Sequence, residues 1–422
     1  MTRWRWLLLQ ISRRLWVRAT LIGLIGVAAA ILAAVVEKYV PWEMPASIDA
    51  AAVDGLLNII ATSMLAVTTF SLSVMTSAYG AATSNVTPRA TKLVMEDRVT
   101  QNVLSTFIGT FLFGIVGIIV LRVGAYGDRG RVILFGVTIL VIVLIVVTLL
   151  RWIDHLTRLG RVGETTTRVE EATRAAIEER ITSPYLGGVP LPDGETRPSE
   201  GASVVLPDAI GYVQHIDVAA LNRIAEGIES KIRIVLNPGA FVYADTVLAW
   251  FDAKNGPDTE HKKAIRQAFT IAAERSFDQD PRFGLAVMSE IASRALSPAT
   301  NDPGTAIDVI GRTTRLMSIW ADRPEKADDP EYLSVMVAPL SDSDLFEDAF
   351  MLVARDGAGL IEVQMRLQKS LLALGRIGGK AFRMAARSQA ELAMDRARRA
   401  LTNDFDRAKL ADLVGQESSQ DR

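Results

Sequence analysis

The stretch at residues 132–150, VILFGVTILVIVLIVVTLL, decides the class of this protein. It is uncharged and consists almost entirely of Val, Ile and Leu. A helix needs about 20 apolar residues to cross the hydrocarbon core of a bilayer. Helices of soluble proteins are seldom apolar on every side. The stretch therefore predicts a transmembrane helix rather than a buried helix of a soluble domain.

Three further stretches are long and apolar enough to cross a bilayer, at residues 15–36, 56–79 and 103–121. The first follows a basic start and contains small residues at 28–30, features that it shares with cleaved signal peptides. Its apolar core is too long for one, and other spans follow, so we expect a retained signal-anchor helix. The sequence thus predicts four spans within residues 1–152.

The orientation of the spans follows from Lys and Arg in the flanking segments, which are enriched on the cytoplasmic side. One side carries Arg3, Arg5, Arg13, Arg14, Arg18, Arg89, Lys92, Arg98, Arg151, Arg158, Arg161 and Arg168. The other side carries Lys38, Arg122, Arg129 and Arg131. Trp16, Trp42 and Trp152 lie near predicted helix ends, where aromatic rings favour the interface. We expect a multi-pass membrane protein with both termini in the cytoplasm.

Composition separates the chain into an apolar third and a polar remainder. The protein has 422 residues, no Cys and 3 His, and its mean hydropathy is +0.23. Residues 1–150 carry 19 charges with a net charge of +5, and the rest carry 75 with a net charge of −7. This excludes a fully soluble enzyme and a disordered protein. The acidic remainder repels phosphate, so nucleic acid is not an expected partner. Without Cys there are no disulfides and no Cys-ligated zinc.

The second span is rich in hydroxyl groups. Helical spacing places on one stripe Asn58, Thr62, Thr69, Ser73 and Thr76, followed by Gly80 and Thr83. One interpretation is a water-lined pathway, formed in an oligomer or against neighbouring helices. The other is close helix packing with hydroxyls bonded across the interface. The sequence leaves both open.

The third span has small residues four apart, with Ser105, Gly109 and Gly114 as the candidates for close helix packing. Such a stripe fits a bundle within one chain and a homo-oligomer equally. No Asp, Glu, Lys, Arg or His lies deep inside any predicted span. Since intramembrane ionisable groups mark energised transport, their absence favours a passive pore or a protein that does not transport.

Several motifs resemble one known family. They are AVTTFSLSV at 66–74, TPR at 87–89, EDR at 96–98 with Gln101, TFIGTF at 106–111, SFDQDPRFGL at 276–285 and ALSPATNDPGTA at 295–306. Together they resemble a bacterial inner-membrane family of predicted membrane proteins of unknown function, over roughly residues 15–375. The resemblance implies four membrane helices and a cytoplasmic domain, and it implies no activity.

The polar remainder predicts an α+β domain with a small hairpin-rich β unit and a helical unit. We expect the fourth span to continue as a charged helix at 151–180. The segment 153–202 then consists of this charged helix and the linker that follows it. A β-rich subdomain at 203–256, a mostly helical one at 257–401 and a flexible tail at 402–422 follow. The turn Asn237-Pro238-Gly239 resembles hairpins of small barrel-sandwich domains. Those domains can carry biotin or lipoate on a Lys, which this turn lacks, so we expect a structural hairpin and no cofactor.

Two helices of the remainder begin with Asp followed by Pro, at Asp280 and Asp302. Simple capping explains this pattern, since Asp accepts the free amide hydrogens and Pro has none to leave unpaired. A second interpretation joins into one oxygen-rich ligand cluster Asp278, Asp280, Asn301 and Asp302. Oxygen ligands suit Ca²⁺ or Mg²⁺, but helix N-termini repel cations and no EF-hand spacing exists, so no metal is assigned. A third interpretation places an anion at Gly304 and Thr305.

Catalytic motifs are missing from the sequence. It contains no P-loop, GxGxxG before a helix, GxSxG or HExxH, and His155, His215 and His261 are scattered. We therefore expect no enzyme. The leading hypothesis is a homo-oligomeric passive channel for ions or small solutes, with a cytoplasmic domain for assembly or gating. The alternative is a membrane-anchored sensor or scaffold whose cytoplasmic domain binds a ligand or a protein.

Overall fold

The computed structural model describes residues 6, 11–12, 15–36, 49–192, 194–252, 259–324 and 329–419. The chain divides into two compact units. An apolar-helix unit comprises residues 7–84 and 91–165, and a helix–sheet unit comprises residues 166–422 with Trp6 and Asn85–Ala90. Some residues on which the predictions of orientation and interface position were based are outside the described residues. They are Arg3, Arg5, Arg13, Arg14, Lys38 and Trp42.

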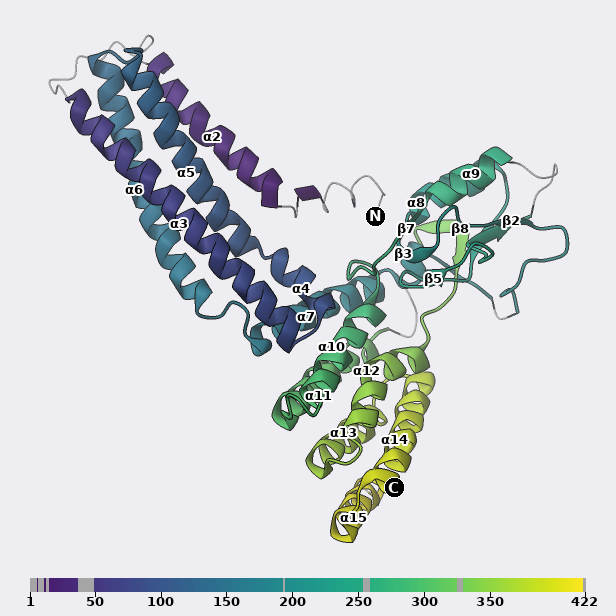
Figure 1. Ribbon diagram of the computed structural model, residues 1–422. Coiled ribbons are helices and arrows are strands. Elements are labelled where there is room, and N and C mark those ends of the chain that lie inside the picture. The colour runs from purple at the N-terminus through teal and green to yellow at the C-terminus, as the bar shows by residue number, and fades with distance from the viewer. Residues whose placement is uncertain are drawn as a thin grey trace. The chain divides into compact units, whose positions relative to one another are not determined.

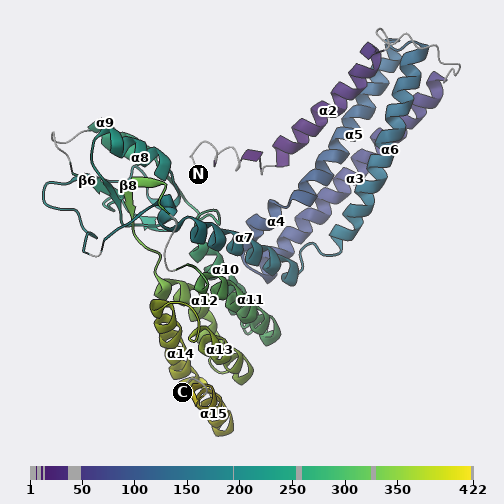
Figure 2. The ribbon, with the colours of Figure 1, turned by 180° about the vertical axis from the view of Figure 1, so that it is seen from behind.

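The apolar-helix unit is built from four helices that lie side by side in Figures 1 and 2. They are α2 (Leu15–Val36), α3 (Ala50–Asn85), α5 (Arg98–Arg122) and α6 (Asp128–Leu156), and a short α4 (Pro88–Met95) follows α3. Among the described residues, three helices are long and apolar enough to cross a membrane, at Ala50–Ser84, Arg98–Arg122 and Asp128–Leu156. The apolar stretch Trp16–Leu32 of α2 is shorter.

The helices of this unit alternate in direction. Asp54 near the start of α3 pairs with Arg122 at the end of α5, so α3 and α5 are antiparallel. Arg18 near the start of α2 donates to Asn102 near the start of α5 at 3.0 Å. Beyond the end of α5, the Tyr126 hydroxyl donates to the Ala30 carbonyl at 2.6 Å. Helix α2 therefore runs parallel to α5 along most of its length.

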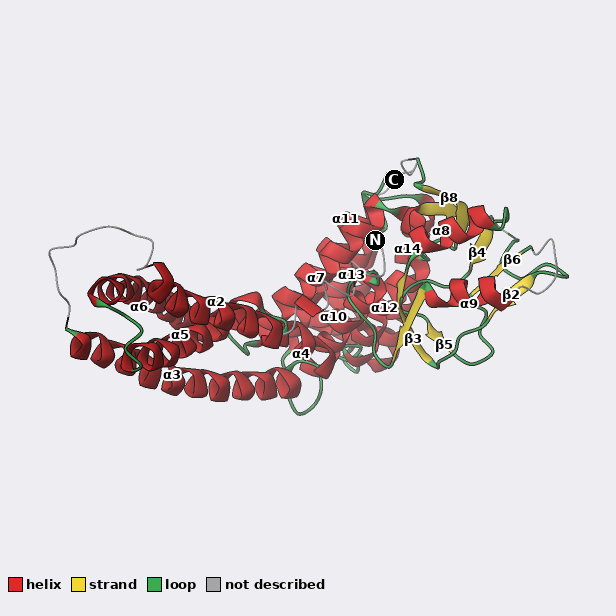
Figure 3. Cartoon of the chain, turned by 90° about the horizontal axis from the view of Figure 1, so that it is seen from above, coloured by secondary structure: helices red, strands yellow, loops and turns green. Residues whose placement is uncertain are grey.

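The helix–sheet unit contains both sheets of the described chain, as Figure 3 shows in yellow. The five-stranded sheet has the order β1-β8-β4-β6-β2, and the three-stranded sheet has the order β5-β3-β7. Their bounds are β1 (Gly188–Pro190), β2 (Ser203–Val205), β3 (Gly211–Ile216), β4 (Ile232–Ile234), β5 (Phe241–Val242), β6 (Ala249–Phe251), β7 (Phe269–Ala272) and β8 (Tyr332–Val337). Strand β8 is parallel to β4, with Ile232 opposite Val335, and also parallel to β1.

One apolar core joins the two sheets. It takes Val213 from β3, Ile234 from β4, Val242 from β5 and Val337 from β8, all at most 1% exposed. The core is covered by α8 (Val218–Gly227), whose Leu221 is fully buried, and α9 (Thr259–Gln267) contributes Ile265. The strands are short, so this shared apolar burial supplies much of their stability.

The rest of the helix–sheet unit is helical. Helix α7 (Val162–Thr182) leads into the 3₁₀ turn η1 (Pro184–Gly187). In the described chain, two helices lie between β7 and β8, and four follow β8. They are α10 (Pro281–Ala295), α11 (Pro303–Ala321), α12 (Asp342–Asp356), α13 (Ile361–Leu374), α14 (Lys380–Ala400) and α15 (Asp404–Ser419), stacked in Figure 1. Helices α12 and α14 meet through Phe346 and Phe382, whose ring centroids are 4.8 Å apart.

Several sequence predictions about this unit are wrong. The expected continuous helix 151–180 is broken between α6 and α7, because Gly160 adopts the left-handed backbone conformation with φ of +79°. The subdomain expected to be mostly helical from residue 257 contains a strand, because α9 ends at Gln267 and the chain continues as β7, which pairs with β3. The expected flexible tail forms α15, because Leu410, only 1% exposed, packs against Leu401 and Met394 of the preceding segment.

The predicted structural hairpin at Asn237–Gly239 is also wrong. The turn itself is present, with the Ala240 amide donating to the Asn237 carbonyl at 3.1 Å. The strands on either side do not pair, because β4 belongs to the five-stranded sheet and β5 to the three-stranded sheet. The division into residues 203–256 and 257–401 fails for a related reason, since β1, β7 and β8 complete the sheets from outside the first range.

Candidate functional site

The hydroxyl stripe of α3 faces outward from the apolar-helix unit. Its exposed members include all five pore-lining candidates, Asn58, Thr62, Thr69, Ser73 and Thr76. Their hydroxyls donate back into their own helix: Thr69 to the Leu65 carbonyl at 2.9 Å and Thr76 to the Leu72 carbonyl at 2.9 Å. Such back-bonding satisfies a hydroxyl without a neighbouring helix. The stripe is therefore not packed against α2, α5 or α6 of the same chain.

The outward faces of α2 and α6 differ from that of α3. Exposed side chains on α2 include Leu21, Leu24 and Ile25, and on α6 they include Leu140 and Val143. These are the side chains that hydrocarbon favours. The α3 face also exposes Ile59, Leu65, Phe70 and Leu72, but it interleaves them with amide and hydroxyl groups. Polarity of the outer surface is thus concentrated on α3.

The packing candidates of α5 lie at helix contacts. An added Cβ at Gly109 would lie 2.8 Å from Ile22 Cγ2 of α2, and one at Gly114 would lie 3.1 Å from the Leu57 carbonyl oxygen of α3. The buried Ser105 hydroxyl donates to the Gln101 carbonyl at 2.6 Å. These residues bring α5 close to two neighbours within one chain.

The predicted ligand cluster of the helix–sheet unit is not assembled. Asp280 caps the start of α10, whereas the Asp302 amide donates to the carbonyl of Ala295, the last residue of α10, at 2.8 Å. With a rise of 1.5 Å per residue, the two helix starts are about 22 Å apart along α10. The predicted convergence is therefore wrong, since α10 and α11 form an antiparallel pair. Among the described residues, no three His, Asp or Glu side chains are placed to share a metal ion.

Each of the predicted ligand residues has a local role. Asp302 accepts from the Thr305 amide at 3.0 Å and from its hydroxyl at 2.6 Å, and these bonds lower the pKa of the carboxyl group. Asp280, 2% exposed, caps α10 at Phe283 and pairs with Arg275 at 2.8 Å. Asn301 has φ of +48° in the turn before α11. Asp278 accepts from Ser276 at 3.0 Å.

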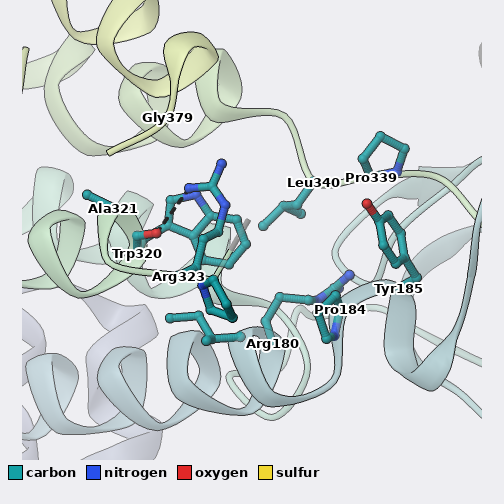
Figure 4. A pocket seen from close by; sticks show the side chains of 11 residues that line it. Arg180, Pro184, Tyr185, Trp320, Ala321, Arg323, Pro339, Leu340 and Gly379 are labelled. Carbon is teal, nitrogen blue, oxygen red and sulfur yellow. Dashed lines mark hydrogen bonds between the residues drawn. The ribbon is translucent and has the colours of Figure 1, made fainter. Parts of the chain in front are cut away.

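A cavity of about 320 Å³ lies elsewhere in the helix–sheet unit, at the end of α7 (Figure 4). Four further segments contribute to its wall: η1, the end of α11, the β8–α12 loop and the loop before α14. The lining residues are Arg180, Ile181, Pro184, Tyr185, Trp320, Ala321, Arg323, Pro324, Pro339, Leu340 and Gly379. The described lining side chains are thus apolar except for two arginines, the Tyr185 hydroxyl and the Trp320 indole N–H, which donates to Asp342.

The two arginines differ in their partners. Arg323 Nη2 donates to both carboxylate oxygens of Asp342, at 3.0 and 2.8 Å, and its guanidinium lies 4.5 Å from the centroid of the Trp320 ring. Arg180 is 5% exposed and donates to two neutral oxygens, Oδ1 of Asn237 at 3.0 Å and the Gln279 carbonyl at 3.4 Å. Burial lowers the pKa of Arg180 to about 10, although the Asp280 charge acts in the opposite direction.

The cavity wall also contains an unusual backbone segment. Tyr185 and Leu186 have φ of 55° and 58°, and Gly187 follows with φ of 85°. Left-handed conformations cost a non-glycine residue of order 1 kcal/mol or more, and such strain often accompanies functional sites. Here the segment ends α7 and turns the chain into β1 beside the cavity.

Sequence reasoning missed this cavity. Arg180 lies on the buried stripe of α7 that contains Val169, Thr173 and Ile177. An arginine at helical spacing from buried positions could have predicted a buried cation from the sequence alone. Trp320 and Arg323 carried no comparable signal, because only the fold brings the end of α11 to α7.

Comparison with known proteins adds the family. The model of the family described as "Predicted membrane protein (DUF2254)" matches residues 12–373. The chain belongs to this family. It is also 26% identical over 277 residues to the uncharacterized proteins Mb1321c of Mycobacterium bovis and Rv1290c of Mycobacterium tuberculosis. The match covers 64% of this chain and 52% of each relative, so the chain spans about half the length of the curated relatives it matches. No solved structure matches the chain.

Proposed function

We propose that this membrane protein forms a homo-oligomer in which the outward faces of α3 surround a passive pathway for ions or small polar solutes. One observation carries the proposal: the exposed side chains of α2 and α6 within their apolar stretches are hydrocarbon apart from Thr20, whereas exposed amide and hydroxyl groups recur along α3. A polar face gains by meeting water or another polar face instead of lipid. In this non-enzymatic role, the helix–sheet unit assembles or gates the oligomer.

The proposed topology has four crossings, with α2 as the fourth. Helix α2 runs beside α5 from Arg18 to Ala30. It therefore extends along the same part of the apolar-helix unit as α5, and we propose that it crosses the bilayer with α5. Trp6 and Asn85–Ala90 both belong to the helix–sheet unit, which lies on one side of a bilayer. The chain between them must therefore cross an even number of times, and α3 accounts for one crossing.

The proposed location is a bacterial inner membrane with the helix–sheet unit and both termini in the cytoplasm. Four basic residues support this side as the cytoplasmic one. They lie at those helix ends that are connected, along the sequence, to residues of the helix–sheet unit, and they are Arg18, Arg89, Arg98 and Arg158. Basic residues are enriched in short cytoplasmic segments, which supports this orientation.

Recording from the purified protein in planar bilayers tests the pathway. We expect conductance that falls at least severalfold in Thr69→Leu and Ser73→Leu, because each replaces a hydroxyl on the polar face by a larger apolar group. Thr20→Leu, which replaces an exposed hydroxyl on α2, is the matched control and should conduct like the parent protein. Absence of conductance, or conductance unchanged by Thr69→Leu and Ser73→Leu, would contradict the proposal.

A second candidate function is that of a membrane-anchored sensor whose helix–sheet unit binds a ligand or a protein. The cavity beside the buried Arg180 favours it. This function requires no conductance, so a silent protein that binds a ligand would support it over the pathway.

A further inference from the structure

Among the described residues that line the cavity at the end of α7, Arg180 is a cation that forms no ion pair. Arg323 is neutralised by Asp342, with which it forms a two-oxygen contact. Among the described residues, no carboxylate oxygen lies within 4.0 Å of the Arg180 guanidinium, and its partners are an amide oxygen and a backbone carbonyl. Buried charges in proteins are usually paired, because desolvation of an unpaired ion is costly. Asp280 and Glu179 act on the Arg180 charge without an ion-pair contact, so an anion in the cavity would add the direct partner that this guanidinium lacks among the described residues.

The guanidinium also retains donors for such an anion. It carries five N–H groups, and its bonds to Asn237 and Gln279 use two of them. Guanidinium donors suit the oxygens of carboxylates and phosphates, which can accept two parallel bonds. In Figure 4 the Arg180 side chain rises from α7 beside Pro184, among the residues that line the cavity.

The remaining wall limits the size and shape of the ligand. About 320 Å³ is near the lower end of the range for small-molecule sites. Ile181, Pro184, Pro324, Pro339 and Leu340 provide apolar contact, and no acidic residue occurs in the described lining. A compact apolar body with one anionic group fits this combination better than a bare ion, which would leave the apolar wall unfilled.

A neighbouring cavity of about 60 Å³ is a poorer place for an anion. It also touches Arg180, but Glu179 and Glu331 are in its lining. Burial raises the pKa of Glu179, as expected where a carboxylate lacks water. Of the two cavities, the larger one is therefore the side of Arg180 on which the described lining contains no carboxylate.

We propose that the larger cavity binds a small organic anion whose carboxylate or phosphate pairs with Arg180 while its apolar body packs against the proline and Trp320 wall. This inference rests on the second candidate function and names its ligand class.

Binding to the purified full-length protein tests the inference with three probes that share a phenyl ring: benzoate, phenyl phosphate and the neutral benzamide, which is isosteric with benzoate. Tryptophan fluorescence and the shift in melting temperature report binding. We expect saturable binding of benzoate or phenyl phosphate, at least about tenfold tighter than benzamide, since hydrogen bonds to charged groups are the stronger ones. The preferred anion distinguishes a carboxylate ligand from a phosphate ester.

Variants separate the cavity from the rest of the surface. Arg180→Met should weaken anion binding about tenfold or more. It also removes the donors to Asn237 and Gln279, so we expect a lower melting temperature of the free protein, and binding is measured below that temperature. Leu340→Trp keeps Arg180 but fills the cavity and should also abolish binding. Arg366→Met, at an exposed position on α13, is the matched control and should bind like the parent.

Three results would overturn the inference: no saturable binding of either anion, equal binding of benzamide, or binding unchanged in Arg180→Met and Leu340→Trp. None of these results contradicts a sensor that binds a protein. A crosslinking search for partners of the full-length protein would test that function separately. Conductance through α3 is likewise independent of these outcomes.

Discussion

Trp6 shows how a single residue far away in the sequence can complete the helix–sheet unit. Its indole Nε1 donates to Asp278 at 3.0 Å, and its ring stacks on His215 with centroids 5.2 Å apart. The side chain is 1% exposed although the residue lies at the very beginning of the chain. Part of the packing of this unit therefore comes from a residue that precedes the first apolar helix.

We predict that Trp6→Ala destabilises the helix–sheet unit by about 3 to 5 kcal/mol, the usual cost of deleting a buried tryptophan. Thermal unfolding of the purified protein would measure this as a lowered first transition. Trp16→Ala, at a position 62% exposed on α2, is the control and should leave that transition unchanged. Equal melting temperatures for the two variants would show that the Trp6 contact contributes no stability.

At the scale of elements, the sequence predicted the helices well and the strand pairing poorly. Helix starts such as those of α10 and α11 were readable because Asp followed by Pro has a local physical meaning. The pairing of β8 with β4 was not readable, since their residues are about 100 positions apart and no local rule connects them. The hydroxyl stripe of α3 was visible as a pattern, but only the structure assigned it to the outer face.

The turn at Gly239 joins two sheets and tolerates no side chain. Gly239 has φ of +95°, and an added Cβ would lie 2.1 Å from Oδ2 of Asp280. We predict that Gly239→Ala lowers stability by about 2 kcal/mol or more, because both backbone strain and displacement of the α10 cap contribute. Unfolding in denaturant would measure the loss.

Gly311→Ala is the matched control for that prediction. Gly311 lies inside α11, and a Cβ there would meet nothing within 4 Å. Since alanine favours helix over glycine, this variant should be equally stable or gain about 0.5 to 1 kcal/mol. Opposite signs for the two Gly→Ala changes would confirm that the contact at Gly239, and not the loss of glycine as such, causes the effect.

At the scale of the whole molecule, the number of crossings decides which segments share a compartment. Four crossings place Ser12 and Ser199 on one side of the membrane, and Asp49 and Ala125 on the other. With three crossings, in which α2 does not span, Ser12 and Asp49 would share a side. The two arrangements therefore differ in the relation of Asp49 to Ser12.

The absence of Cys from the sequence makes this difference directly measurable, because each introduced thiol is a unique reporter. We predict that a membrane-impermeant maleimide applied outside intact spheroplasts labels Asp49→Cys and Ala125→Cys, and labels Ser12→Cys and Ser199→Cys only in inverted vesicles. Labelling after detergent lysis controls for accessibility of each thiol. If Asp49→Cys and Ser12→Cys were labelled from the same side, α2 would not cross, and the polar face of α3 would have to be explained in a three-span bundle.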